Sequence, residues 1–185
     1  MIDILGYAVV CEADCIADAS GRMPASLKTE AEWAFFQNGL DACDAVVLGR
    51  KSHEVTPNPK ARRRLVMTRG ETAPRRLGQA PTVLWNPDHA DMQEALQLFE
   101  TGINRLGITG GQGVFDYFLT GPSAYTHFYL SRIAGVLLSG GQTVFSDMRE
   151  AGPTAEDCLS AAGYTATEHR QLDEVSSVVR WTHSA

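Results

Sequence analysis

Short apolar runs that end at turn residues recur along the chain and predict β-strands. The predicted strands are Ile2–Val10, Ala45–Gly49, Leu65–Thr68, Thr82–Trp85, Leu106–Thr109, Phe128–Ile133, Tyr164–His169 and Ser177–Thr182. Only the polar stretch 170–176 separates the last two runs. This stretch is too short for a crossover helix, so we expect the last two strands to form an antiparallel hairpin.

Between the strands, apolar residues recur with the helical period at Thr29–Leu40, Asp91–Glu100 and Gln112–Leu119. In the first segment we expect Trp33, Phe36 and Leu40 to lie along one buried stripe of the helix, with Thr29 as its capping residue. Alternating strands and helices predict an α/β fold with a central, mostly parallel mixed sheet and the hairpin at one edge. In such sheets ligands bind at the carboxyl ends of the strands.

The composition and charge of the chain exclude several classes of partner and site. The chain has 185 residues, of which 44% are apolar, so we expect a single domain spanning residues 1–185. Its net charge of −6 argues against nucleic acid or an anionic membrane as a partner. No apolar run reaches transmembrane length, and Asp3 stands where a signal peptide carries a basic residue, so we expect a cytoplasmic protein. The four cysteines form no Cys-x-x-Cys motif and the histidines are scattered, so no metal site is expected.

Two glycine-marked junctions between a strand and a helix carry candidate chemistry. Gly110 and Gly111 follow an apolar strand and precede a helix, whose first N–H groups and dipole suit phosphate. Gly49 ends another strand and is followed at once by the phosphate-competent side chains Arg50, Lys51 and Ser52, at the start of the next helix.

A third basic element includes seven of the sixteen lysines and arginines. They are Lys60, Arg62, Arg63, Arg64, Arg69, Arg75 and Arg76. Such a cluster predicts a local field that attracts a polyanion, although a basic loop kept in water for solubility explains the arginine triplet equally well. Arg69, directly after a strand, is the stronger candidate for a ligand contact.

Six short segments in order resemble the dihydrofolate reductase superfamily. They are Met23–Pro24, Glu32–Gln37, Leu48–Glu54, Leu65–Arg69, Gly110–Leu119 and Phe128–Ile133. That superfamily includes the dihydrofolate reductases, the reductase domain of the bifunctional deaminase/reductase of riboflavin biosynthesis, and stand-alone relatives of that domain. The resemblance extends from residue 1 to about residue 183, and the segment 136–145 is closer to the riboflavin-type branch.

The resemblance implies a three-layer fold with helices on both faces of the sheet, and NADPH as cofactor. Gly49, Arg50, Lys51 and Ser52 would hold its phosphates. Met67, Thr68 and Arg69 would lie beside the adenosine, where an arginine favours the 2′-phosphate of NADPH over NADH. The remaining cofactor residues implied by the resemblance are Gly110, Gly111, Gln112, Gly113 and Val114, with a cis peptide bond joining the glycine pair.

The resemblance also implies a catalytic carboxylate on the first helix. Glu32 lies four residues before Phe36, as in dihydrofolate reductases, whereas counting from Met23–Pro24 without a gap selects Glu30. Two helical positions that are two residues apart face about 200° apart, so only one of them can face the cleft, and we favour Glu32. Ser131 keeps the hydroxyl that supports the carboxylate. Burial would raise the pKa of this acid toward neutrality, as a proton donor requires.

Together these residues predict an NADPH-dependent reductase that transfers a hydride to a heterocyclic or ribosylaminopyrimidine-type small molecule. Two positions depart from the dihydrofolate reductase pattern: Ala25 replaces a tryptophan and Phe115 replaces a hydroxylated aromatic residue. A true dihydrofolate reductase and a catalytically silent nucleotide-binding relative therefore remain alternatives. The chain carries no zinc motif of a deaminase. A homodimer is expected from the resemblance.

Overall fold

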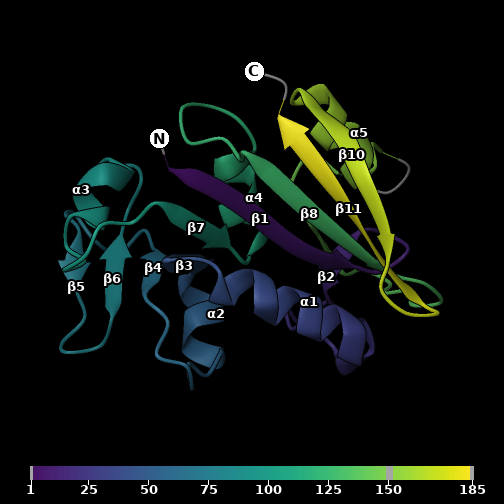
Figure 1. Ribbon diagram of the computed structural model, residues 1–185, viewed down its shortest axis with the longest axis horizontal. Helices are drawn as coiled ribbons and strands as arrows, with labels where there is room; N and C mark the ends of the chain where they lie inside the picture. The colour runs from purple at the N-terminus through teal and green to yellow at the C-terminus, as the bar shows by residue number, and fades with distance from the viewer. Residues whose placement is uncertain (1, 149–151, 184–185) are drawn as a thin grey trace.

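A computed structural model of the protein describes residues 2–148 and 152–183. In this part of the chain a nine-stranded sheet forms the centre of the fold (Figure 1). Its strands are β1 (Asp3–Val10), β3 (Ala45–Gly49), β4 (Arg64–Met67), β5 (Arg75–Arg76), β6 (Thr82–Trp85), β7 (Arg105–Ile108), β8 (His127–Ile133), β10 (Tyr164–Gln171) and β11 (Ser176–His183). Their order across the sheet is β10-β11-β8-β1-β7-β3-β4-β6-β5.

The six central strands from β8 to β6 run parallel, so their carboxyl ends share one edge of the sheet. β10 and β11 form the expected antiparallel hairpin, and β11 pairs with β8. All eight predicted strands are present, with ends that differ from the predicted ones by no more than two residues. β5, an antiparallel edge strand of two residues, was not predicted.

Five α-helices and one 3₁₀ helix occur in the described residues. They are η1 (Ala25–Leu27), α1 (Glu30–Asp41), α2 (Arg50–Val55), α3 (Met92–Leu96), α4 (Gln112–Leu119) and α5 (Ala155–Ala161). The prediction of α1 and α4 is confirmed, whereas α3 is shorter than expected. None of the helices in 2–148 and 152–183 is both long and apolar enough to cross a membrane.

Helices cover both faces of the sheet, and the two larger of three apolar clusters lie between the sheet and these helices. Side chains that alternate along a strand point to opposite faces, so neighbouring residues join different clusters. Ile4 and Val47 pack with residues of α3, α4 and α5, whereas Leu5 and Val46 pack beneath α1. The fold is therefore the expected three-layer arrangement, in which α1 and α2 lie along the same side of the sheet (Figure 1).

The buried stripe of α1 differs from the predicted one. Leu40 is buried as expected and Phe36 is half-buried, but Trp33 is 38% exposed. Glu32 takes the inward position and is only 2% exposed. Periodicity of apolar residues could not identify this position, because the side chain is a carboxylic acid.

Sequence patterns also missed α5 and a small sheet of β2 (Cys15–Ala17) with β9 (Gln142–Thr143). α5 starts at a local capping box of Thr154 and Asp157, and contacts with distant residues hold both elements in place. Asp14 accepts a hydrogen bond from the first N–H of α5, at Ala155 (3.0 Å), and forms an ion pair with Arg132 of β8 (2.5 Å). One carboxylate therefore connects the turn before β2, the central sheet and α5.

Candidate functional site

Three loops that carry predicted cofactor residues lie side by side at the carboxyl edge. Gly49 at the end of β3 is in register with Met67 at the end of β4. On the other side of β3, the Gly49 N–H donates to the carbonyl oxygen of Gly110 (3.2 Å), and the Thr109 N–H donates to Val47 (2.9 Å). Segments 49–52, 67–69 and 110–114 therefore lie at one continuous rim.

The glycine pair adopts backbone torsions that favour glycine. Gly110 has φ of 133° and Gly111 has φ of 78°. The described residues contain no cis peptide bond, so the expected cis bond between these glycines is wrong. Two successive residues with positive φ reverse the chain into α4 while the peptide between them stays trans.

The first turn of α4 presents free backbone donors to this rim. Gly111 is the N-cap and supplies no side chain, while its carbonyl accepts from the N–H groups of Val114 (2.9 Å) and Phe115 (3.1 Å). Among the described residues, nothing accepts a hydrogen bond from the N–H groups of Gln112 and Gly113. These donors and the helix dipole favour an anion at this place.

Two of the predicted cofactor residues serve packing with their side chains. The Gln112 amide donates to Thr143 Oγ1 (2.9 Å) and to the carbonyl of Phe145 (3.3 Å), which fixes the loop around β9. Val114 is buried, and a Cβ atom added at Gly49 would lie 3.4 Å from its Cγ2. Only the backbone of Gln112 is therefore available to a ligand, and Val114 shapes the floor below Gly49.

The basic turn after β3 is exposed. Arg50 forms an ion pair with Glu54 one turn later (2.6 Å), and both side chains are more than half exposed. Such a pair contributes little to stability, so the guanidinium can exchange this partner for a ligand anion. Lys51 is exposed and has no ion-pair partner in the described part of the chain, and Ser52 is half-buried at the start of α2.

The turn after β4 is held by main-chain contacts. Thr68 donates its N–H to the carbonyl of Trp85 (2.9 Å), and its hydroxyl accepts from the N–H of Gly70 (3.3 Å). The carbonyl of Arg69 accepts from the Asn86 amide (3.4 Å). The Arg69 guanidinium is solvent-exposed and pairs with no acid among the described residues, so it is available to a ligand.

Most of the basic cluster at 60–76 is engaged within the protein, contrary to the expected field for a polyanion. Lys60 and Arg62 both pair with Asp41. The two arginines of β5 pair with acids as well. Arg64 is buried and donates to the carbonyls of Thr56 (2.9 Å) and Pro57 (2.8 Å). Of the seven residues, only Arg63 and Arg69 have side chains without such partners in the described residues.

The acid that faces inward from α1 is Glu32. Its N–H is capped by the Thr29 hydroxyl (3.1 Å), which fixes the start of the helix. Burial raises the pKa of Glu32 to about 7, while the Ser131 hydroxyl and the positive charge of Lys28 act in the opposite direction. Glu30 is exposed. The geometry therefore supports Glu32 rather than Glu30 as the acid that faces the sheet.

Glu32 and Ser131 lie toward the same edge as the glycine pair. Ser131 is near the carboxyl end of β8 and in register with Val9 of β1. Beside Glu32 the ring centroids of Trp33 and Phe36 are 5.5 Å apart, and the Lys28 ammonium lies 3.6 Å from the Trp33 ring centroid. This flank of α1 offers a flat aromatic surface and a cation next to a protonatable acid.

The described residues contain no group of three or more side chains that could ligate a metal. The cysteines are free thiols; Cys11 and Cys15 are buried, and Cys43 and Cys158 are half-buried. Phe115, one of the two departures from the dihydrofolate reductase pattern, is 1% exposed and packs edge-on against Phe128. That position therefore belongs to the core.

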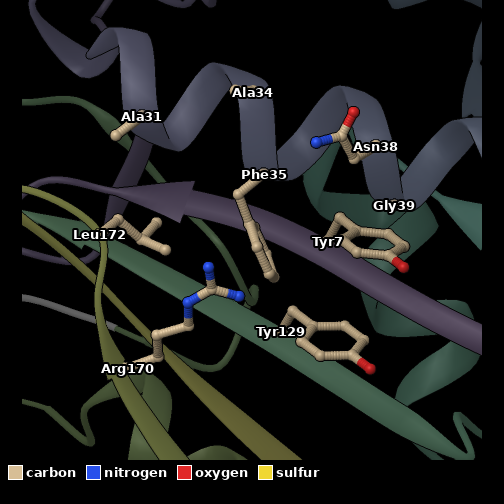
Figure 2. Close-up of a pocket in the computed structure, with 9 residues that line it drawn as sticks. All are labelled: Tyr7, Ala31, Ala34, Phe35, Asn38, Gly39, Tyr129, Arg170 and Leu172. Atoms are coloured by element: carbon tan, nitrogen blue, oxygen red, sulfur yellow. The ribbon is translucent and has the colours of Figure 1, made fainter.

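A hollow of about 470 Å³ lies elsewhere, between α1 and the C-terminal half of the sheet (Figure 2). Its walls include Tyr7, Phe35, Tyr129 and Arg170, none of which was predicted as a site residue. Tyr7 and Tyr129 look like ordinary alternating residues of two apolar strands. Only the pairing of β1 with β8 brings them together, so no sequence pattern could have identified them.

No protein-family model matches the chain, and no curated protein matches it. Solved structures do. The chain superposes over its full length on a protein assigned to riboflavin biosynthesis from Shewanella sp. PV-4, covering 100% of both chains with a TM-score of 0.68 and 14% identity.

Two further structures give similar values. One is the diaminohydroxyphosphoribosylaminopyrimidine deaminase/5-amino-6-(5-phosphoribosylamino)uracil reductase from Thermotoga maritima. The match covers 99% of this chain and 57% of that enzyme, with a TM-score of 0.67 and 14% identity. The other is dihydrofolate reductase from Enterococcus faecalis, solved with NADP(H). The match covers 99% of this chain and 97% of that enzyme, with a TM-score of 0.66 and 16% identity. The chain therefore has the fold of the dihydrofolate reductase superfamily.

Proposed function

We propose that the protein is an NADPH-dependent reductase of a small heterocyclic substrate of the ribosylaminopyrimidine type. The observation that carries this proposal is the placement of a buried, protonatable acid at the same sheet edge as three anion-competent loops. Glu32 has a pKa of about 7, and Gly49 is hydrogen-bonded to Gly110 at that rim. The fold shared with two reductases supports the same conclusion.

The residues at the rim fit a dinucleotide with a 2′-phosphate. The free N–H groups of Gln112 and Gly113 at the start of α4 suit the pyrophosphate. Arg50 and Lys51 would add charge beside it, and Arg69 would pair with the 2′-phosphate. NADPH bound here supplies a hydride for an electrophilic carbon of a C=N or C=O group.

Reduction of such a bond also requires a proton at nitrogen or oxygen. Glu32 holds a proton near neutral pH, because its burial disfavours the charged form. The Ser131 hydroxyl favours the charged form of the carboxyl group, and the Lys28 ammonium lies over the Trp33 ring beside it. Glu32 would therefore bind the substrate's polar edge and deliver the proton, while the apolar surroundings exclude water.

Two features favour a ribosylaminopyrimidine over dihydrofolate. Ala25 occupies an exposed position in η1, where dihydrofolate reductases carry a tryptophan that helps to form the pterin pocket. The Lys28 ammonium above Trp33 places a cation beside the acid, which suits a substrate that carries a phosphate.

The test is oxidation of NADPH, followed by absorbance, with 5-amino-6-(5-phosphoribosylamino)uracil and with dihydrofolate as substrates. We expect turnover with the first compound, and a loss of about tenfold or more in kcat for Glu32→Gln with NADPH affinity unchanged. Turnover with dihydrofolate alone would identify a dihydrofolate reductase. NADPH binding without turnover of either compound would identify a silent relative. Both results would overturn the proposal.

A further inference from the structure

The hollow beside α1 is an open depression with an aromatic base. Its base is a cluster of three aromatic rings, in which Tyr7 and Tyr129 stack with centroids 5.0 Å apart and an interplanar angle of 10°. The Phe35 ring meets both edge-on, at 6.5 Å from Tyr7 and 5.8 Å from Tyr129. Its volume of about 470 Å³ is within the range of small-molecule sites.

Small residues of α1 keep this space open. Ala31 and Ala34 contribute only methyl groups to the wall. Gly39 lets the helix backbone approach Tyr7 closely, since a Cβ atom there would lie 2.6 Å from the Tyr7 ring. A larger side chain at any of these positions would fill the hollow or displace its aromatic base.

Polar groups with no partner among the described residues stand at both ends of the hollow. At one end the Arg170 guanidinium points toward α1, across the Phe35 ring from Tyr7 and Tyr129 (Figure 2). Arg170 forms no ion pair and no hydrogen bond through its side chain within the described residues, in contrast to Arg180, which pairs with Glu168 (3.2 Å).

At the other end stand the hydroxyls of Tyr7 and Tyr129, and the Asn38 amide projects from α1 above these rings (Figure 2). These three side chains likewise make no hydrogen bond in the described part of the chain. Burial raises the pKa of Tyr7 well above its ordinary value, so its hydroxyl stays protonated and can donate. The hollow therefore has a cationic end, an aromatic middle and a neutral hydrogen-bonding end.

This hollow adjoins the proposed reductase site but opens on another flank of α1. Tyr129 of its base lies two residues before Ser131 in β8, and the Tyr7 ring meets Phe36 edge-on at 6.3 Å. Residues Ala31, Phe35 and Asn38 form one stripe of α1, at the spacing of helical neighbours. Trp33 lies on the opposite flank, and Gln37 on that flank contacts Arg62 of the loop before β4 (2.9 Å). A molecule in the hollow would therefore contact the helix from the side of β8 and β10.

We propose that this hollow is a second ligand site, which binds an elongated aromatic carboxylate that carries a hydroxyl or amine at its far end. The carboxylate pairs with Arg170 through a charge-assisted contact. The aromatic body packs against Phe35 and the methyl groups of Ala31 and Ala34. The far polar group exchanges hydrogen bonds with Asn38 and the tyrosine hydroxyls. The lining includes neither Glu32 nor any residue assigned to NADPH, so binding here can be measured without reductase activity.

Calorimetric titration of the whole protein with 6-hydroxy-2-naphthoate tests this site. We expect saturable binding with one molecule per chain. 2-Naphthol lacks the carboxylate, so its affinity should be lower by about tenfold or more. Arg170→Gln should lower the affinity for 6-hydroxy-2-naphthoate by about tenfold or more, and Ala34→Trp should abolish binding by filling the space. Arg180→Gln is the matched control. It removes a cation from the same face of the sheet, but this cation is already paired with Glu168.

Arg170 is exposed, so its substitution should leave the fold intact, which circular dichroism checks. Absence of binding at millimolar probe would overturn the proposal. An equal loss of affinity in Arg170→Gln and Arg180→Gln would also overturn it. The overall positive charge of this face, and not a specific contact with Arg170, would then explain the binding. Dissociation of a dimer by Ala34→Trp in sedimentation would show that a second copy covers the hollow, and would overturn it as well.

Discussion

The backbone N–H of Gly49 donates a hydrogen bond to the carbonyl oxygen of Gly110 at a distance of 3.2 Å. This contact joins the two glycine-marked junctions, which are sixty-one residues apart in the sequence. It lies where β3 and β7 end, so the phosphate-competent turn after β3 and the first turn of α4 are held in a fixed relation. The following substitutions test this arrangement and the acid that faces it.

Replacing Gly110 by alanine should destabilise the protein through its backbone. A Cβ atom would find space there, 3.7 Å from the Phe115 ring, but φ of 133° is strained for any residue with a side chain. We expect the free energy of unfolding to fall by about 1–3 kcal/mol, measured by urea denaturation.

Gly113→Ala is the matched control, because Gly113 lies within α4 with no atom near its Cβ position. Alanine should stabilise that helix by about 0.5–1 kcal/mol. Equal effects of the two substitutions would contradict the assigned role of the Gly110 torsion.

Glu32 should make stability depend on pH in a defined window. The folded protein keeps a proton on Glu32 up to pH about 7, whereas the unfolded chain releases it at its ordinary pKa of 4.5. Stability should therefore fall as the pH rises from about 4.5 to about 7, and this contribution should stay constant above that range.

Glu32→Gln removes this penalty. The variant should be more stable than the parent at pH 8 by about 2 kcal/mol and similar to it below pH 5, as measured by urea denaturation at both pH values. Glu30→Gln, at an exposed position, is the control and should show no such change. A Glu32 variant that is less stable than the parent at pH 8 would argue against a buried, protonated acid.

Ser131→Ala should raise the pKa of Glu32. The hydroxyl favours the charged form of the carboxyl group, so its removal leaves the larger effect of burial opposed only by the charge of Lys28. We expect the titration midpoint of Glu32 to rise by about one pH unit, followed by NMR of the labelled carboxyl carbon. Ser177→Ala on the neighbouring strand controls for general effects. An unchanged or lower midpoint in Ser131→Ala would rule out this interaction.

Arg64 should matter for stability and not for cofactor binding. Its buried guanidinium satisfies the carbonyls of Thr56 and Pro57, so Arg64→Met leaves these groups without their donor. We expect a loss of about 2–3 kcal/mol in the free energy of unfolding, compared with less than about 0.5 kcal/mol for Arg63→Met. If Arg64→Met has the same free energy of unfolding as the parent but no longer binds NADPH, then Arg64 contacts the cofactor instead.

Much of the fold could be predicted from the sequence because its central strands are short, apolar and bounded by turn residues. The glycine junctions at Gly49 and Gly110, predicted to end two strands of one sheet, lie together at its carboxyl edge. Prediction failed where structure depends on distant partners. α5 has a local capping box of Thr154 and Asp157, but Asp14 from the turn before β2 anchors its first N–H to the sheet. Glu32 is buried at a position that apolar periodicity does not mark.

The basic segment at 60–76 illustrates the same limit for charge. Composition alone indicated a positive surface, but Asp41 of α1 pairs with both Lys60 and Arg62. Such pairs form only after the loop before β4 packs against the helix. The roles of the individual rim residues toward NADPH, and the homodimer expected from the resemblance, remain predictions for experiment.

We propose that the rim formed by the loops after β3, β4 and β7 binds NADPH. Calorimetric titration of the parent protein with NADPH at pH 7 tests it most directly. We predict saturable binding of one NADPH per chain, with an affinity that falls by about tenfold or more in Arg69→Gln. The absence of binding at millimolar NADPH would contradict the account.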